Sequence, residues 1–225
     1  MQNNFFTKRI TIFAGHYGSG KTTLTANGAL YLAGLGHTVC VCDLDIVNPY
    51  FKTAGFADLF SDNGVALICS AYANTNVDVP SLPPEANSIF DETEKLAVID
   101  LGGDAKGAAA LGRYAARLNA DGGSEMLLVV NRYRPLTRGA DSLIEIRREI
   151  EDASGVPFAG IVNNSNLGGE TSRADVENSL AFAEGASALL KLPVVFTAVS
   201  AEVYGGRPPA GYFPVRVYKK TAWNV

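Results

Sequence analysis

The residues with the clearest chemical potential form one run near the start of the chain, Gly15-His16-Tyr17-Gly18-Ser19-Gly20-Lys21-Thr22. The run fits the pattern G-x-x-x-x-G-K-[ST] of loops that hold nucleotide phosphates. Its glycines let successive backbone N–H groups point at one anion, and the helix expected next adds the positive end of its dipole. The other explanation is a glycine-rich turn with a surface lysine. We favour the first explanation and expect the run to bind a nucleoside triphosphate.

Acidic residues follow two apolar runs further along the chain. Asp43 and Asp45 come at the end of the first, and Asp100 ends the second, directly before Leu101-Gly102-Gly103-Asp104. At the carboxyl edge of a parallel sheet these carboxylates would lie beside the phosphates and handle a cation or a water. The glycines would let a backbone N–H approach the terminal phosphate. Without the phosphate loop, the first two acids would be read as turn caps and the glycine pair as a turn.

Other polar residues leave alternatives open. Asn163 follows an apolar run and either reads a purine edge or forms an ordinary turn. Arg132 and Arg134 also follow an apolar run, and either face an anionic substrate or partner or lie in a solvated loop. Cys40 and Cys42 would share one face of a strand, where they either meet a soft metal or, far more commonly, pack in the core.

The elements that must position these residues alternate along the chain. Apolar runs rich in β-branched and aromatic residues predict strands at 9–14, 38–43, 65–69, 96–100, 125–130, 158–162 and 193–197. Helical patterns lie between them, at 22–35, 105–119, 139–153 and 173–190. Residues 213–220 alternate like an edge strand or arm, and residues 70–87 form a partly helical insertion or a binding loop. The pattern predicts an α/β fold with a doubly wound, mostly parallel sheet flanked by helices.

Length and composition indicate one nucleotide-binding domain over residues 1–225. Hydrophobic content of 47% with 19% charged residues excludes a disordered chain. The formal charge of −4 argues against a broad nucleic-acid-binding face, because phosphate neutralisation needs clustered Lys and Arg. No run has the length of a membrane span, the first residues start no signal peptide, and the three cysteines include no C-x-x-C pair. We expect a cytoplasmic protein without direct nucleic-acid or membrane binding.

Taken together, the phosphate loop, the Asp43-x-Asp45 strand end and the segment Asp100-Leu-Gly-Gly-Asp104 resemble the MinD/ParA and nitrogenase iron protein superfamily of P-loop ATPases. The resemblance covers most of residues 8–200 in order and spacing. The sequence as a whole is similar to MinD-like ATPases that carry this Gly-His-Tyr-Gly-Ser-Gly-Lys loop. It implies that the β- and γ-phosphates are cradled by Gly18, Ser19, Gly20 and Lys21. It implies further that Thr22 ligates magnesium and that Thr23 reaches the α-phosphate.

The same resemblance implies roles for the acids. Asp45, or less readily Asp43, would orient the attacking water, and Asp100 would hold magnesium through a water. Gly103 would offer its N–H to the γ-phosphate. Asp104 would move with the switch that the nucleotide controls, and it counts with Lys21, Asp43 and Asp45 among the expected catalytic residues.

Three departures from the family pattern narrow this expectation. His16 stands where these relatives usually carry a lysine that reaches across a dimer, and a neutral imidazole cannot supply that constant charge. A nucleotide-sandwich dimer with such a lysine is therefore not favoured, although a homodimer stays among the expected partners. Gly107 and its neighbours supply no cluster-binding cysteine, so we expect no iron–sulfur cluster. No Asn-Lys-x-Asp follows a strand, which favours adenine over guanine.

The expected function is slow, magnesium-dependent ATP hydrolysis that switches the binding of a partner protein. One alternative is a small-molecule kinase or ATP-dependent ligase of the dethiobiotin synthetase or cobyrinate amidotransferase type. In that case Arg132, Arg134 and residues 70–87 would form the pocket of the phosphoryl acceptor. A further alternative is a nucleotide-binding scaffold without turnover.

Overall fold

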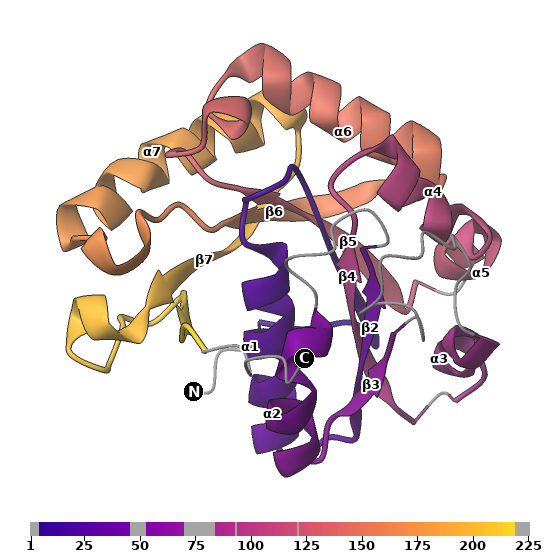
Figure 1. Cartoon of the computed structure of the whole chain (residues 1–225). Coiled ribbons are helices and arrows are strands. Elements are labelled where there is room, and N and C mark those ends of the chain that lie inside the picture. Colours follow the sequence, from indigo (N-terminus) through magenta and orange to yellow (C-terminus); the bar gives the residue numbers. More distant parts are fainter. Residues whose placement is uncertain (1–4, 46–52, 70–83, 93, 121, 219–225) are drawn as a thin grey trace, which may run out of the picture.

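The computed structural model describes residues 5–45, 53–69, 84–92, 94–120 and 122–218. Eight strands of this described part form one sheet in the order β3-β2-β4-β1-β5-β6-β7-β8, and every neighbouring pair is parallel (Figure 1). The strands are β1 (Ile10–Ala14), β2 (Val39–Leu44), β3 (Ala66–Ile68), β4 (Leu96–Leu101), β5 (Ser124–Val130), β6 (Phe158–Asn163), β7 (Val194–Ser200) and β8 (Tyr212–Val215). The predicted fold class is therefore confirmed, with the sheet wholly parallel.

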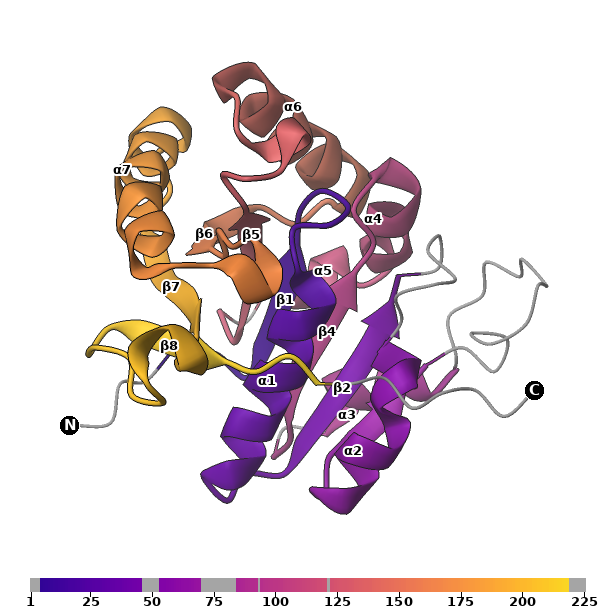
Figure 2. The same cartoon turned by 60° about the vertical axis from the view of Figure 1, so that its left-hand side comes forward.

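Helices cover both faces of the sheet. They are α1 (Lys21–Gly34), α2 (Ala57–Asp62), α3 (Ser88–Asp91), α4 (Ala105–Gly112), α5 (Ala115–Ala120), α6 (Ala140–Ser154) and α7 (Arg173–Leu190). Figures 1 and 2 show α1 and α2 on one face and α4, α5 and α6 on the other. None of these helices is long and apolar enough to cross a membrane.

Strand β1 shows how the sequence builds the two layers. Ile10, Ile12 and Ala14 pack into the apolar cluster under α4, α5 and α6, whereas Phe13 packs into the cluster under α1. Successive side chains of a strand point to opposite faces, so a strand buried on both faces reads as a continuous apolar run. This is why the run 9–14 predicted a buried strand, which the sheet order places between β4 and β5.

Two predicted elements differ in detail from the observed ones. The helix expected over 105–119 is broken, because α4 ends at Gly112 and α5 begins at Ala115. The break falls at a glycine, which is a poor helix former, and Gly112 packs in ordinary contact with the end of α6, where a β-carbon would lie 3.4 Å from the Ala153 carbonyl oxygen. The tail expected as an edge strand or arm over 213–220 is strand β8 at the sheet edge, and residues 219–220 lie outside the described part.

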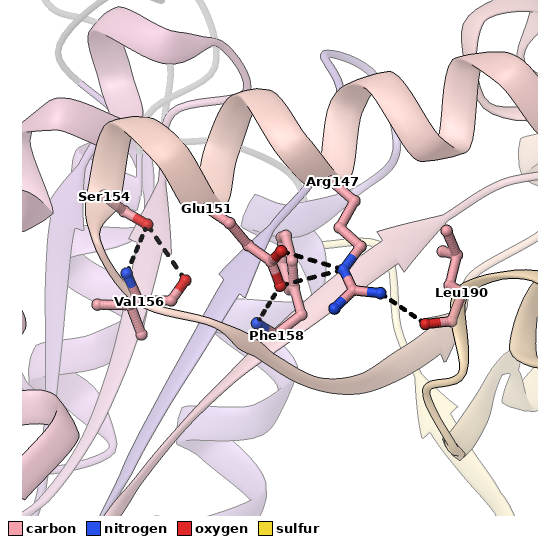
Figure 3. Close-up of polar contacts among 6 residues, drawn as sticks. All are labelled: Arg147, Glu151, Ser154, Val156, Phe158 and Leu190. Carbon is pink, nitrogen blue, oxygen red and sulfur yellow. Dashed lines mark hydrogen bonds and ion pairs between the residues drawn. The ribbon is translucent and has the colours of Figure 1, made fainter.

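A polar junction fixes α6 and α7 to the start of β6 (Figure 3). The Arg147 Nε donates to both carboxylate oxygens of Glu151 at 3.1 Å, and its Nη1 donates to the Leu190 carbonyl at 2.6 Å. Glu151 Oε1 also accepts from the Phe158 backbone N–H at 2.8 Å. The junction lies at the amino-terminal end of β6, so it serves the fold at the end of the sheet away from the predicted motifs.

Candidate nucleotide-binding site

The segment between β1 and α1 has the backbone of an anion-binding loop. Gly15, Gly18 and Gly20 have φ values of 139°, 78° and 95°, which residues with a β-carbon rarely adopt. Gly20 is the N-cap of α1, makes no side-chain cap, and is followed by no acidic residue in the first turn. The positive end of the α1 dipole is therefore left for an anion from outside the helix.

The loop is enclosed by neighbouring strands and loops, because β1 lies between β4 and β5 in the sheet. A β-carbon on Gly15 would lie 2.6 Å from the Val129 carbonyl oxygen of β5, and one on Gly20 would overlap the amide nitrogen of Asn164. On the other side, a β-carbon on Gly103 would lie 2.8 Å from the Gly15 carbonyl oxygen. Figure 2 shows the loop at the end of the sheet from which the chain enters α4 and α6.

Lys21 and its neighbours line this loop. The Lys21 Nζ lies 3.4 Å from the His16 carbonyl oxygen, to which it donates. Burial lowers the pKa of Lys21, against the opposing pull of Asp100, Asp45 and Asp104. The ammonium is thus held in a low-dielectric position where a phosphate would gain more from it than in water.

The side chains of residues 16–23 differ in exposure. His16 is half-buried, with its Nδ1 3.2 Å from the Tyr17 carbonyl oxygen, while Tyr17 is 58% exposed. Ser19 is fully buried, and its hydroxyl oxygen has no hydrogen-bond partner among the described residues. In the first turn of α1, Thr22 and Thr23 are half-buried, and the Thr23 carbonyl accepts from the Asn27 amide at 2.8 Å.

The predicted acids meet on β2 and β4. Asp43 and Asp100 are paired in the parallel register of the two strands. Asp45 donates its backbone N–H to the Asp43 Oδ1 at 3.0 Å, and both side chains are buried. Desolvation and the nearby Asp43 raise the pKa of Asp100 well above its usual value, although Lys21 opposes the shift. The sheet therefore concentrates negative charge in a place where water cannot screen it.

Asp100 is the most deeply buried of these three acids. Its side chain is 0% exposed, and neither carboxylate oxygen has a hydrogen-bond partner within the described part of the chain. The Thr22 hydroxyl is near enough to favour the ionised form of Asp100 without satisfying either oxygen. A buried carboxylate with unused lone pairs beside a hydroxyl fits a cation or a cation-bound water.

The residues around Asp100 suit a magnesium ion that is held partly by water and phosphate, and not a metal that needs only protein ligands. The described residues contain no group of three or more His, Cys, Asp or Glu side chains arranged to hold a metal. Mg²⁺ commonly keeps several waters and takes only one or two protein ligands together with substrate phosphates, as Thr22 and Asp100 would provide. Cys40 and Cys42 are buried in the core, and burial raises the pKa of both thiols, which disfavours the thiolates that a soft metal needs.

The glycine segment after β4 packs directly on the phosphate loop. A β-carbon on Gly103 would also lie 2.9 Å from the Tyr17 backbone nitrogen. Asp104 is the N-cap of α4 and accepts from the Gly107 N–H at 2.7 Å. This cap couples any movement of Gly103 to the start of α4. It uses one Asp104 oxygen for the helix, so the role in catalysis expected for this residue stays a hypothesis.

Two asparagines lie at the end of β6, Asn163 as its last residue and Asn164 directly after it. The Asn163 side chain is fully buried, donates to the Ser179 hydroxyl at 2.9 Å and accepts from the Ser165 hydroxyl at 2.7 Å. These internal hydrogen bonds favour a structural role over base reading. Asn164, which the sequence reasoning missed, donates to the Ser19 carbonyl at 2.7 Å and so supports the phosphate loop. Only its position directly after a strand could have drawn attention to it.

The two arginines after β5 have different surroundings. Arg132 donates through Nη1 to the Asn178 carbonyl on α7, which holds it at the side of the sheet. Arg134 instead lies against Gly18 of the phosphate loop. These contacts disfavour Arg132 as part of the pocket for a phosphoryl acceptor that was suggested for both arginines. The remaining part of that pocket, at residues 70–83, lies outside the described residues, as does the segment 46–52 after Asp45.

A glycine-rich loop between a central parallel strand and a helix, flanked by strand-terminal acids, defines a P-loop nucleotide-binding domain. Residues 10–174 match the family described as CobQ/CobB/MinD/ParA nucleotide binding domain. The chain belongs to this family, which confirms the superfamily named from the motifs. Among the curated proteins, none matches it significantly.

Solved structures with a similar fold include FtsY from Mycoplasma mycoides, which is 20% identical with a TM-score of 0.56 over 88% of this chain and 61% of that one. The 54 kDa signal recognition particle protein from Aeropyrum pernix K1, in complex with GDP, is 17% identical with a TM-score of 0.56 over 85% of this chain and 41% of that one. This chain thus spans less than two thirds of either protein. Identities this low establish a shared fold and nothing more specific.

Proposed function

We propose that this domain binds ATP with Mg²⁺ at residues 15–22 and hydrolyses it slowly, acting in the cytoplasm as a switch for a protein partner. The observation that carries the proposal is the buried Asp100 carboxylate, whose oxygens lack hydrogen-bond partners in the described part of the chain. It lies beside Lys21 and a loop of backbone amides, an arrangement that costs stability unless a cation and phosphates complete it.

The residues divide the work as follows. The loop amides and Lys21 hold the β- and γ-phosphates, while Thr22 and Asp100 hold the metal, directly and through water. When bound, Mg²⁺ neutralises charge that develops on the phosphate oxygens. Asp45 orients a water for in-line attack on the γ-phosphorus. The bond from phosphorus to the bridging oxygen breaks, and ADP, phosphate and a proton leave.

Asp45 is favoured over Asp43 for the water. The Asp45 Oδ1 lies 3.4 Å from the point where a β-carbon on Gly102 would be, next to the glycine segment that faces the terminal phosphate. The Asp43 Oδ1 already accepts from the Asp45 N–H. Asp43 therefore serves to position Asp45 and to set the charge around Asp100.

The switch is the contact of Gly103 with the phosphate loop. A γ-phosphate that takes a hydrogen bond from the Gly103 N–H would hold this segment, and hydrolysis would release it. Asp104 would carry the difference into α4. A partner protein, or a second copy of the chain, would then distinguish the two states.

Titration calorimetry with ATP, ADP, GTP and GDP, each with and without Mg²⁺, tests the binding step. GTP and GDP are included because one solved structure of similar fold holds GDP. We expect ATP binding that needs Mg²⁺ and is lost in the Lys21→Ala variant, together with slow phosphate release. Absence of heat with all four nucleotides would refute the proposal.

Two further measurements separate the proposed switch from its alternatives. Sedimentation with ADP and then with a non-hydrolysable ATP analogue would show a nucleotide-dependent mass change if the switch controls self-association. A sharp rise in ATP consumption with one metabolite would point instead to phosphoryl transfer to a small molecule. ATP binding without any phosphate release would leave a scaffold.

A further inference from the structure

Arg134 lies directly against the phosphate loop. Its Nε and Cζ atoms are 3.8 Å and 4.0 Å from the point where a β-carbon on Gly18 would be. The contact arises from the sheet order, because β5 is the neighbour of β1 and the two loops leave the sheet side by side. A guanidinium therefore stands next to the backbone that the phosphates would contact.

The segment that carries Arg134 is held firmly. The Arg134 N–H donates to the Asn131 carbonyl at 3.1 Å, and the Arg134 carbonyl accepts from the Thr137 N–H at 3.1 Å. The Tyr133 hydroxyl donates to the Asp175 carbonyl at 2.8 Å, and Pro135 limits the backbone on the other side. With the backbone fixed, only side-chain freedom is lost when the guanidinium takes a ligand.

Nothing in the described part of the chain neutralises this side chain. Arg134 is exposed and makes no ion pair with the described residues, whereas Arg147 is paired with Glu151. The Arg132 guanidinium donates a hydrogen bond to the Asn178 backbone carbonyl of α7. A guanidinium stays charged at any physiological pH and can donate two parallel hydrogen bonds to phosphate oxygens.

The contact falls on the part of the loop that serves the terminal phosphate. The Lys21 Nζ lies 3.4 Å from the His16 carbonyl, and Gly103 packs on Gly15 and Tyr17, so both converge on the arch next to Gly18. The lysine of such a loop reaches the β- and γ-phosphates. An anion held by this arch would therefore lie with its outermost phosphate close to Arg134.

We propose that Arg134 is a phosphate-binding residue that contacts the terminal phosphate of a bound nucleoside triphosphate and so favours triphosphate over diphosphate. This inference rests on the proposed nucleotide-binding function. It gives the site a second fixed positive charge from the same chain, supplied by a different loop from that of Lys21. An arginine in such a position stabilises the charge on the transferring phosphoryl group as well as the bound triphosphate.

Calorimetry with MgATP and MgADP on the wild type and on Arg134→Gln tests the inference. We expect the variant to lose about tenfold or more in affinity for MgATP, since a charge-assisted phosphate contact is removed, and to lose much less for MgADP. Arg134→Lys, which keeps the charge but not the fork, should lie between them. Arg138→Gln is the matched control, because Arg138 is an exposed arginine of the same loop without an ion pair among the described residues.

The possible outcomes separate this inference from the function it rests on. If the wild type binds neither nucleotide, the proposed function and this inference both fail. If the wild type binds MgATP and the Arg134→Gln variant binds it as the Arg138→Gln control does, only the inference on Arg134 fails. Equal losses for MgATP and MgADP would also overturn it, because they would indicate a general effect of charge. A thermal melt of each variant checks that the fold is intact.

Discussion

Replacing Asp100 by asparagine should make the free protein more stable and, at the same time, unable to use a nucleotide with its metal. The side chain is 0% exposed, and both oxygens lack partners in the described part of the chain. Asparagine has the same shape, so the substitution leaves no cavity. Above the raised pKa of Asp100 it removes one negative charge beside Asp43, and at any pH it supplies an amide donor among acids.

The size of the effect follows from this burial. Leaving a buried polar group unsatisfied costs about 1 to 3 kcal/mol, and more for a charged group, so the variant should gain about that amount in free energy of unfolding. For a chain of this size each kcal/mol shifts the melting temperature by about 2 to 4 °C. We therefore expect the Asp100→Asn variant without ligand to melt about 2 to 12 °C above the wild type.

The gain should depend on pH in a defined direction. Burial, then Asp43, raise the pKa of Asp100 above its usual 3.8, so the folded protein holds a proton that the unfolded chain has lost. The unfolded state then binds fewer protons, and the wild type loses stability as pH rises from about 4 toward the raised pKa. The variant lacks this loss. Its advantage should be small near pH 4 and grow toward neutral pH.

Nucleotide should reverse the order of stability. A ligand at a concentration of 100 times its Kd stabilises the protein that binds it by about 2.7 kcal/mol. The wild type should gain this with MgATP, whereas the variant, which has lost a group that holds the metal, should gain little. Melting curves at several pH values, with and without MgATP, measure both effects. A variant that is less stable than the wild type without ligand near pH 7.5, or one that MgATP stabilises equally, would refute the reasoning.

Three further predictions concern the support of the site. Gly103→Ala places a β-carbon 2.8 Å from the Gly15 carbonyl oxygen, and overpacking of this kind costs about 1 to 3 kcal/mol. The variant should therefore bind MgATP more weakly and release phosphate more slowly. Gly123→Ala is the control, because its β-carbon meets open space, and it should change neither. Asn164→Ala removes the hydrogen bond to the Ser19 carbonyl and should weaken MgATP binding about 3- to 10-fold in calorimetry; unchanged affinity would show that the loop keeps its shape without it. Glu151→Ala should lower the free energy of unfolding, measured in urea, by about 1 to 2 kcal/mol, because the Phe158 N–H loses its acceptor and the partly exposed ion pair contributes little. The affinity for MgATP should stay unchanged, and a change in it would contradict a purely structural role for Glu151.

Much of the fold could be read from the sequence because its signals are local. The run 9–14 is rich in β-branched and aromatic residues, and the pattern 173–190 is helical, so strand β1 and helix α7 were predicted close to their observed bounds. The helix expected over 105–119 was wrong in one respect. The helical pattern continues through Gly112, but α4 ends there, at a residue type that is a poor helix former, and α5 begins at Ala115.

Asn163 and Asn164 show where local reasoning ends. Both are polar residues at the end of β6, and nothing in their spacing separates them. Neighbouring side chains on an extended chain point to opposite sides, so one faces Ser179 in the interior and the other faces Ser19 in the phosphate loop. Which of the two supports the loop depends on what packs against each face.

The sequence by itself determined the phosphate loop, the acids at the strand ends and the class of fold, because each is set by residue types at short, fixed separations. Tertiary structure alone decided that Asp100 is sealed beside Asp43, that Gly103 presses on the loop and that Arg134 reaches Gly18. These contacts depend on β1 lying between β4 and β5, strands that are far from it along the chain. Neighbour relations of this kind arise from the packing of the whole sheet, and no short stretch of residues encodes them.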